Sequence, residues 1–239
     1  MIDRSGAAYV GNLGPVPLYI HPSAMVLVFL AWMWAPTGGA GADIVAIVLL
    51  LAVLVKAILL HELGHGFAAM LMGARDVTIT LWAMGGLCSS QRYHDRPVGE
   101  MFILAAGPAV SFALYGLGWA ALYLLATYQP DLLVDNGQPT LLREFIVYTI
   151  ILNFWLGVFN SLPIFPLDGG QFLYHLMRLF KVPLHLVHQS CFYLAVIFVV
   201  LLLLWRFHVG QGQIDGGFVY TVILLGFLLY NAHIYLMQR

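Results

Sequence analysis

Residues 44–72 read IVAIVLLLAVLVKAILLHELGHGFAAMLM. A helix needs about 20 mostly apolar residues to cross a bilayer, and this stretch is longer than that. Its only Lys, Arg, Asp or Glu residues are Lys56 and Glu62. The stretch therefore predicts a transmembrane helix that carries a polar cluster near its C-terminal end.

The composition of the whole chain agrees with a membrane protein. Of its 239 residues 62% are hydrophobic and only 9% are charged, whereas about a quarter of the residues are charged in an average soluble domain. The net charge of −1 offers no basic surface for nucleic acid. These values exclude a disordered chain, a disulfide scaffold and an ordinary cytosolic enzyme. Cys88 and Cys191 are expected to be buried thiols.

The apolar segments predict an all-α polytopic membrane protein with about six transmembrane helices. We expect the spans at residues 18–35, 44–72, 98–127, 141–162, 184–205 and 218–237. Residues 76–91, between the second and third spans, alternate partly and begin rich in β-branched residues. This pattern predicts a small membrane-associated β-hairpin or re-entrant segment, with an ordinary interfacial loop as the alternative.

The basic residues predict the orientation. If the N-terminus is cytoplasmic, only Arg143 and Arg206 fall outside. The basic residues that then fall inside are Arg4, Arg75, Arg92, Arg96, Arg178, Lys181 and Arg239. The positive-inside rule therefore predicts that both termini are cytoplasmic. In this topology the second and fourth spans both run inward, so their C-terminal ends lie at the same depth.

A metal-binding motif lies near the end of the second span. Residues 61–65 read His-Glu-Leu-Gly-His, an H-E-x-x-H sequence. Residues i and i+4 share one face of a helix, so His61 and His65 can bind one cation. Glu62 stands beside the first ligand, where it can act as a base on a metal-bound water. The alternative is a pair of interfacial histidines, which the apolar surroundings disfavour.

A second motif follows the fourth span. Catalytic zinc usually has three protein ligands, so another segment must supply the third. Residues 160–170 read NSLPIFPLDGG, and they place Asp168 at about the depth of the first motif. The two prolines end the regular helix, and the Gly-Gly pair permits a turn. Asp168 is thus a candidate ligand; capping of the following helix is the alternative, compatible role.

Together, the two motifs resemble the site-2 protease family of intramembrane zinc metalloproteases. The resemblance extends to Ala106-Gly107-Pro108-Ala109 in the third span and to Gly85-Gly86. The similarity is to the minimal, mostly prokaryotic members, so no PDZ or CBS domain is expected here.

The resemblance implies roles for individual residues. His61, His65 and Asp168 are expected to bind Zn²⁺, with Glu62 as general base and proton shuttle. Asn160 is expected to hold the substrate or the developing oxyanion, a role that suits a neutral hydrogen-bond donor. Its alternative role is interhelical hydrogen bonding, which is also expected of Asn153.

The implied activity is that of an intramembrane zinc endopeptidase. It would cleave transmembrane segments of membrane-protein substrates, as in regulated intramembrane proteolysis. Residues 1–239 would form a single transmembrane metalloprotease domain. The protein would be a multi-pass protein of a prokaryotic cell membrane, with its active site toward the cytoplasm. Its expected partners are transmembrane protein substrates and the lipid bilayer; its oligomeric state does not follow from the sequence.

Two other classes of function use the same ligands. A divalent-metal transporter would use them as a transit site, but its ligands would line a path across both leaflets. A non-catalytic membrane binding protein would not need Glu62 beside the histidines. The role of Lys56 stays open between contact with substrate or lipid and a buried pair with an acid. His21 is expected to be an interfacial residue.

Overall fold

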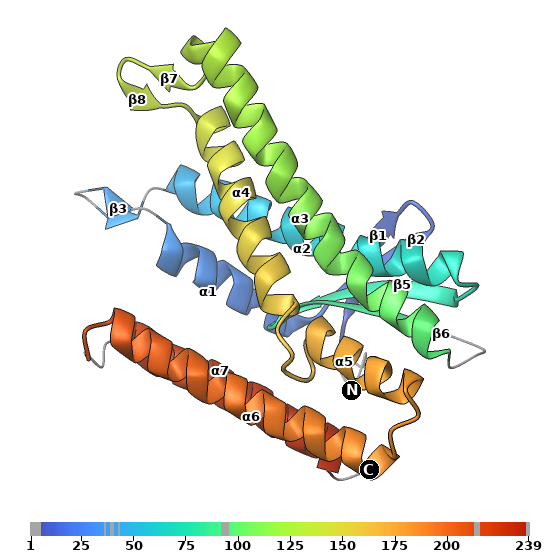
Figure 1. The fold of residues 1–239 in the computed structure, drawn as a ribbon. Coiled ribbons are helices and arrows are strands. Elements are labelled where there is room, and N and C mark those ends of the chain that lie inside the picture. The colour runs from blue at the N-terminus through green and yellow to red at the C-terminus, as the bar shows by residue number, and fades with distance from the viewer. Residues whose placement is uncertain are drawn as a thin grey trace. The chain divides into compact units, whose positions relative to one another are not determined.

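The structure is a computed structural model that describes residues 6–35, 37–38, 41–42, 44–91, 96–212 and 216–237. It is mostly helical with a small β-sheet (Figure 1). The chain divides into two compact units. The first comprises Met1–His94 and Ala106–Gly157, and the second comprises Asp95–Ala105 and Val158–Arg239.

Among the described residues, four helices are long and apolar enough to cross a membrane: α2, α3, α4 and α6. Their bounds agree to within a few residues with the spans expected at 44–72, 98–127, 141–162 and 184–205, and their crossing of a membrane stays a prediction. The α-helices are α1 (Met25–Trp34), α2 (Ile44–Leu71), α3 (Pro97–Tyr128), α4 (Leu141–Asn160), α5 (Asp168–Leu179), α6 (Leu184–Val209) and α7 (Gly216–Met237). Helix α7 covers the sixth expected span, but its apolar part, Thr221–Leu236, falls among the shorter apolar helices. Six crossings are therefore a prediction that the helix lengths support only in part.

The expectation of one continuous span over residues 18–35 is wrong. Its first residues belong to strand β2 (Val16–Ile20), and a 3-10 helix, η1 (Pro22–Ala24), precedes the ten residues of α1. A helix of that length is about 15 Å long, half the thickness of the hydrocarbon core. His21 has a capping role here, because its Nδ1 accepts a hydrogen bond from the Ser23 amide at 3.2 Å.

The predicted hairpin at residues 76–91 is confirmed as strands β5 (Arg75–Trp82) and β6 (Gly85–Gln91), which pair antiparallel. It is half of a four-stranded sheet in the order β1-β2-β5-β6 (Figure 1). Strand β1 (Ala8–Leu13) pairs antiparallel with β2, and β2 pairs parallel with β5. The mostly helical class is thus confirmed, but the all-α label needs correction, because β1 and β2 extend the predicted hairpin to a four-stranded sheet.

The smaller elements lie in connections between the helices. They are the strand pair β3 (Thr37–Gly38) and β4 (Gly41–Ala42), the 3-10 helix η2 (Pro130–Leu132), and the strand pair β7 (Val134–Asp135) and β8 (Gln138–Pro139). In the first unit, buried Leu27, Ile58 and Leu81 join α1, α2 and β5 into one apolar cluster. This cluster packs the sheet against the helix that carries the first motif.

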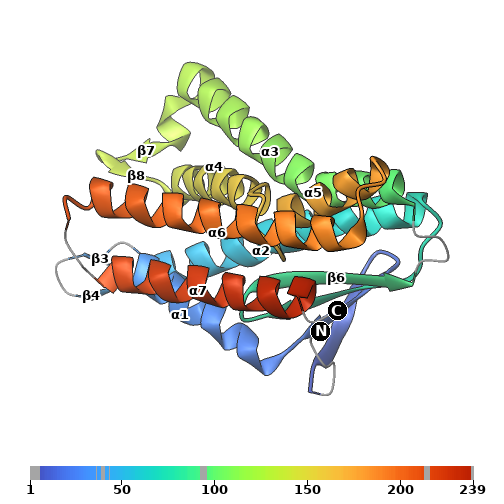
Figure 2. The ribbon, with the colours of Figure 1, turned by 60° about the horizontal axis from the view of Figure 1, so that its bottom comes forward.

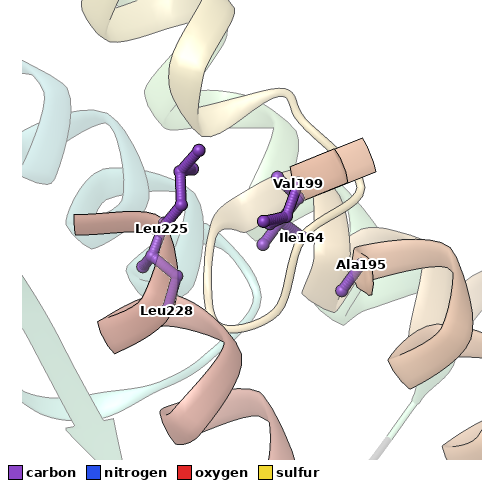
Figure 3. Close-up of a cluster of buried hydrophobic side chains, with 5 residues drawn as sticks. All are labelled: Ile164, Ala195, Val199, Leu225 and Leu228. Carbon is purple, nitrogen blue, oxygen red and sulfur yellow. The ribbon is translucent and has the colours of Figure 1, made fainter. Parts of the chain in front are cut away.

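The second unit contains α5 and a pair of long helices, α6 and α7, which lie side by side (Figure 2). Figure 3 shows one of its apolar clusters, in which Ile164 lies among side chains of α6 and α7. The members of this cluster are Ile164, Ala195, Val199, Leu225 and Leu228. A second cluster contains Phe165, Val187, Cys191, Ala232 and Leu236. Because both clusters hold a residue of the segment between α4 and α5, this segment is anchored just before Asp168.

Candidate metal centre

The H-E-x-x-H residues lie on α2, as predicted, and all three polar side chains are buried. His61 is 2% exposed, Glu62 9% and His65 7%. The Nε2 atoms of the two histidines are 3.2 Å apart. Two ring nitrogens this close suit either one hydrogen bond or two lone pairs directed at a shared cation. The structure thus confirms that the two imidazoles converge.

Ser111 orients one of these imidazoles. Its Oγ lies 2.9 Å from Nδ1 of His61, and the serine is completely buried on α3. A hydrogen bond at Nδ1 holds the ring and leaves Nε2 to face His65, which is the usual arrangement of a metal-binding histidine. The sequence analysis missed Ser111. A signal was present, because Ser111 lies four residues after Gly107 and so shares its helix face.

Gly107 keeps the space beside the two imidazoles open. A methyl group at this position would overlap Nε2 of His65 and would lie 2.7 Å from Nε2 of His61. At Gly64, a methyl group would lie 2.8 Å from the Ala106 carbonyl oxygen. The backbones of α2 and α3 therefore approach each other closely at the motif. The absence of a side chain at Gly107 leaves room for the two imidazoles.

Strand β6 lies against the catalytic candidate Glu62. A methyl group at Gly86 would overlap Cγ of Glu62 and would lie 2.8 Å from its Oε1. One turn further along α2, a methyl group at Gly66 would meet Val77 at 3.2 Å and Cys88 Sγ at 3.6 Å. Since residues 62 and 66 share a helix face, the β5–β6 hairpin covers this face while α3 covers the face of the histidines.

Asp168 and Asn160 belong to the second unit. Asn160 is the half-buried last residue of α4, and Asp168 is the half-buried first residue of α5. The alternative of Asp168 as the N-cap is wrong, because Leu167 occupies that position. Methyl groups at Gly169 and Gly170 would overlap the backbone at Ser161 and Ile164. The Gly-Gly pair therefore allows the segment between α4 and α5 to pack closely against the first turn of α5.

The residues of the first unit fit a zinc ion. Zinc prefers imidazole nitrogen ligands, and its histidine ligands usually make a second hydrogen bond through the other ring nitrogen. His61 has this bond, to Ser111. The missing side chain at Gly107 leaves room next to both Nε2 atoms. A carboxylate is an acceptable further ligand for zinc.

Lys56 is expected to contact substrate or lipid or to pair with an acid; among the described residues it instead contacts α4. Its Nζ donates a hydrogen bond to Thr149 Oγ1 at 2.9 Å and lies 4.1 Å from the centroid of the Phe145 ring. Asn153 is expected to form a hydrogen bond between helices. Its amide nitrogen instead donates to the Thr149 carbonyl of its own helix at 2.8 Å. Lys56 of α2 thus contacts α4, whereas this hydrogen bond of Asn153 stays within α4.

Comparison with known proteins places the chain in a family. The model of peptidase family M50 matches residues 47–142 and 135–204, so the chain belongs to this family. The zinc metalloprotease MJ0392 of Methanocaldococcus jannaschii is 36% identical over 125 residues, 52% of this chain and 33% of that protein. The stage IV sporulation protein FB of Bacillus subtilis is 27% identical over 207 residues, 86% of this chain and 63% of that protein.

A solved structure has a similar fold. It is the site-2 protease from Methanocaldococcus jannaschii, with a TM-score of 0.60, 23% identity, and coverage of 95% of this chain and 94% of that chain. The predicted family is therefore confirmed, and the predicted enzyme class and metal agree with the names of relatives. This chain covers between 33% and 63% of the length of its curated relatives.

Proposed function

We propose that this protein is a membrane-embedded zinc endopeptidase that cleaves transmembrane segments of other membrane proteins. The observation that carries the proposal is the buried pair of imidazoles, with Nε2 atoms 3.2 Å apart, beside the buried Glu62. These groups lie on α2, a helix long and apolar enough to cross a membrane. Ionisable residues inside a membrane are costly and are usually retained for function.

The ligand set that we propose is His61, His65 and Asp168. Two imidazole nitrogens and one carboxylate oxygen would leave a position of the metal open, as in catalytic zinc sites. When bound, zinc supplies a Lewis acid that polarises the scissile carbonyl and acidifies a water molecule. Ser111 keeps the His61 ring in the orientation that ligation requires.

Glu62 would move the proton in this reaction. Its carboxylate takes a proton from the attacking water as the water oxygen bonds to the scissile carbonyl carbon. Glu62 then gives this proton to the leaving amine nitrogen as the C–N bond breaks. Such positioned proton transfer contributes about 10²- to 10⁴-fold to a rate. Asn160 would donate a hydrogen bond to the substrate or to its developing oxyanion.

Strand β6 offers a way to present the substrate. A transmembrane helix hides its peptide bonds in its own hydrogen bonds, so it must unwind before cleavage. Strand β6 is a terminal strand of the four-stranded sheet, and its Gly86 lies against Glu62. An unwound segment that adds to this edge as a further strand would pass beside the proposed base.

The location that we propose is a prokaryotic cell membrane, with the catalytic motif toward the cytoplasm. His61 lies about 26 Å along α2 from Ile44, close to the far side of the hydrocarbon core. Most basic residues fall on this same side in the topology with cytoplasmic termini. The proposed site would then receive water from the cytoplasm.

The function can be tested in liposomes with a panel of single-span membrane proteins. Wild type and Glu62→Gln are compared, and Glu144→Gln is the matched control because this glutamate lies in the first turn of α4. We expect Glu62→Gln to bind zinc normally but to lose cleavage, while Glu144→Gln cleaves like wild type. Full cleavage by Glu62→Gln would contradict the mechanism. Zinc flux into the liposomes without any cleavage would support the transporter instead.

A further inference from the structure

The turn between α5 and α6 lies in a segment without negative charge. Residues 169–212 contain Arg178, Lys181 and Arg206 but no Asp or Glu. Two of these cations lie at the turn, and His175, His185 and His188 lie within two turns of it along the flanking helices. Positive charge is thus concentrated at one end of the long helix α6.

The backbone of this turn is fixed by hydrogen bonds. The Lys181 amide donates to the Arg178 carbonyl at 3.0 Å, and the Val182 amide donates to the Met177 carbonyl at 3.2 Å. Lys181 adopts the left-handed conformation, with φ of 57°, that commonly ends a helix. Val182 then packs against a buried cluster that includes Val187. The cations are therefore carried by a packed corner.

Side chains of both helices gather around one tyrosine. The Arg178 guanidinium carbon lies 5.8 Å from the centroid of the Tyr174 ring. The His188 ring, from α6, stacks on the same tyrosine with centroids 5.8 Å apart and an interplanar angle of 24°. Lys181 and His185 are exposed, and each lies three residues along the chain from a member of this group, Arg178 and His188 respectively. Together these residues form a basic surface supplied by two helices.

Large apolar side chains are exposed at the same corner. Phe180 is 74% exposed and Leu184 54%. Leu179 and Leu186 beside them are also exposed, at 42% and 43%. Helix α5 has 12 residues and is about 18 Å long, too short to cross the hydrocarbon core. Exposed apolar groups next to cations are typical of a segment at the membrane interface, where cations meet headgroups and apolar groups enter the acyl region.

We infer that the α5–α6 corner, formed by Arg178, Lys181, His185 and His188 with the exposed apolar residues beside them, binds anionic phospholipid. The phosphate of the headgroup would lie among the basic side chains, and the acyl chains would contact Phe180 and Leu184. An anionic lipid is the occupant that matches both the charge and the apolar surface. This inference does not depend on the proposed protease activity.

The test measures lipid binding to the full-length purified protein. Native mass spectrometry follows titration with phosphatidylglycerol or with phosphatidylcholine. The corner variant is Arg178→Gln/Lys181→Gln, and the matched control is Arg143→Gln/Arg206→Gln, which neutralises two cations that do not belong to the corner. We expect wild type and control to prefer phosphatidylglycerol, and the corner variant to bind it about 30-fold more weakly, at about 1 kcal/mol for each cation removed.

Two further measurements keep the inference open to refutation. The variant Arg178→Lys/Lys181→Arg retains both charges and should retain the preference, and a thermal melt of each variant shows whether it folds. Equal binding of phosphatidylglycerol by the corner and control variants would overturn the inference. Displacement of the lipid by inorganic phosphate alone would overturn the choice of a lipid as the occupant.

Discussion

The two units of the molecule differ in what they bury. All the buried polar side chains among the described residues lie in the first unit: His61, Glu62, His65, Thr78, Thr80, Ser111, Thr149 and Asn153. The two buried clusters of the second unit consist of apolar residues and Cys191. Burying a polar group without a partner is unfavourable, and a membrane offers no water to compensate.

The two units should therefore respond differently to substitution. In the first unit, the buried polar groups include His61, Glu62, His65 and the hydrogen-bond partner Ser111, so small changes at these residues should alter metal binding before they alter folding. In the second unit, which also carries Asn160 and Asp168, the apolar clusters hold α6 and α7 together, so changes within the clusters should alter folding first. Four experiments test this difference between the units.

The largest effect is expected for Gly107→Ala. The added methyl group would overlap Nε2 of His65, so the two imidazoles can no longer face a common ion. We expect loss of bound zinc and of cleavage, measured by metal content per chain and by the liposome assay. Gly116→Ala on the same helix is the control, because a methyl group there meets nothing within 4 Å. Normal zinc content in Gly107→Ala would contradict the proposed position of the ion.

A substitution that creates a cavity in the second unit should lower stability without changing zinc binding. Ile164 is completely buried among side chains of α6 and α7 (Figure 3). We expect Ile164→Ala to lower the free energy of unfolding by about 2–5 kcal/mol, measured by denaturant titration in detergent. The folded fraction should keep one zinc per chain. The half-exposed Ile197→Ala is the control, and an equal loss of stability in both variants would refute the role of this cluster.

Removal of the hydroxyl at Ser111 should weaken metal binding without abolishing it. The hydrogen bond to His61 Nδ1, at 2.9 Å, would be lost. Loss of such a partner typically lowers metal affinity about 10- to 100-fold. Competition of Ser111→Ala with a zinc chelator measures this affinity, and Ser190→Ala on α6 is the control. An unchanged affinity would show that Ser111 does not orient the ring.

The smallest effect is expected at the contact between Lys56 and Thr149. A double-mutant cycle with Lys56→Met and Thr149→Val isolates the hydrogen bond of 2.9 Å between them. Interhelical hydrogen bonds in a membrane contribute about 0.6 kcal/mol on average, and we expect a coupling energy near this value in unfolding measurements. A coupling of zero would mean that Lys56 serves a different purpose in the membrane.

The sequence predicted the parts of the fold that follow from local pattern. Long apolar runs identified α2, α3, α4 and α6, and β-branched alternation identified the hairpin of β5 and β6. The prediction of one transmembrane helix over residues 18–35 failed, because a short apolar run does not distinguish a strand from a helix. The partner strands β1 and β2 could not be predicted, since their pairing with β5 depends on contacts distant in the sequence.

In the candidate metal centre too, some features follow from the local sequence pattern and others depend on contacts distant in the sequence. The spacing of His61 and His65 predicts their convergence, because a helix places residues i and i+4 on one face. The roles of Ser111, Gly107 and Gly86 arise only where α3 and β6 pack against α2. Tertiary packing, which the spacing of residues does not encode, determines these contacts.

We propose that Asp168 binds the same zinc ion as His61 and His65. X-ray absorption at the zinc edge can identify this ligand, with Asp168→Cys compared with wild type and with Asp131→Cys, a control in η2 on the exposed surface. We predict one new zinc–sulfur distance of about 2.3 Å in Asp168→Cys alone. Zinc bound in the wild-type amount by Asp168→Cys, with no sulfur in its coordination sphere, would contradict the claim.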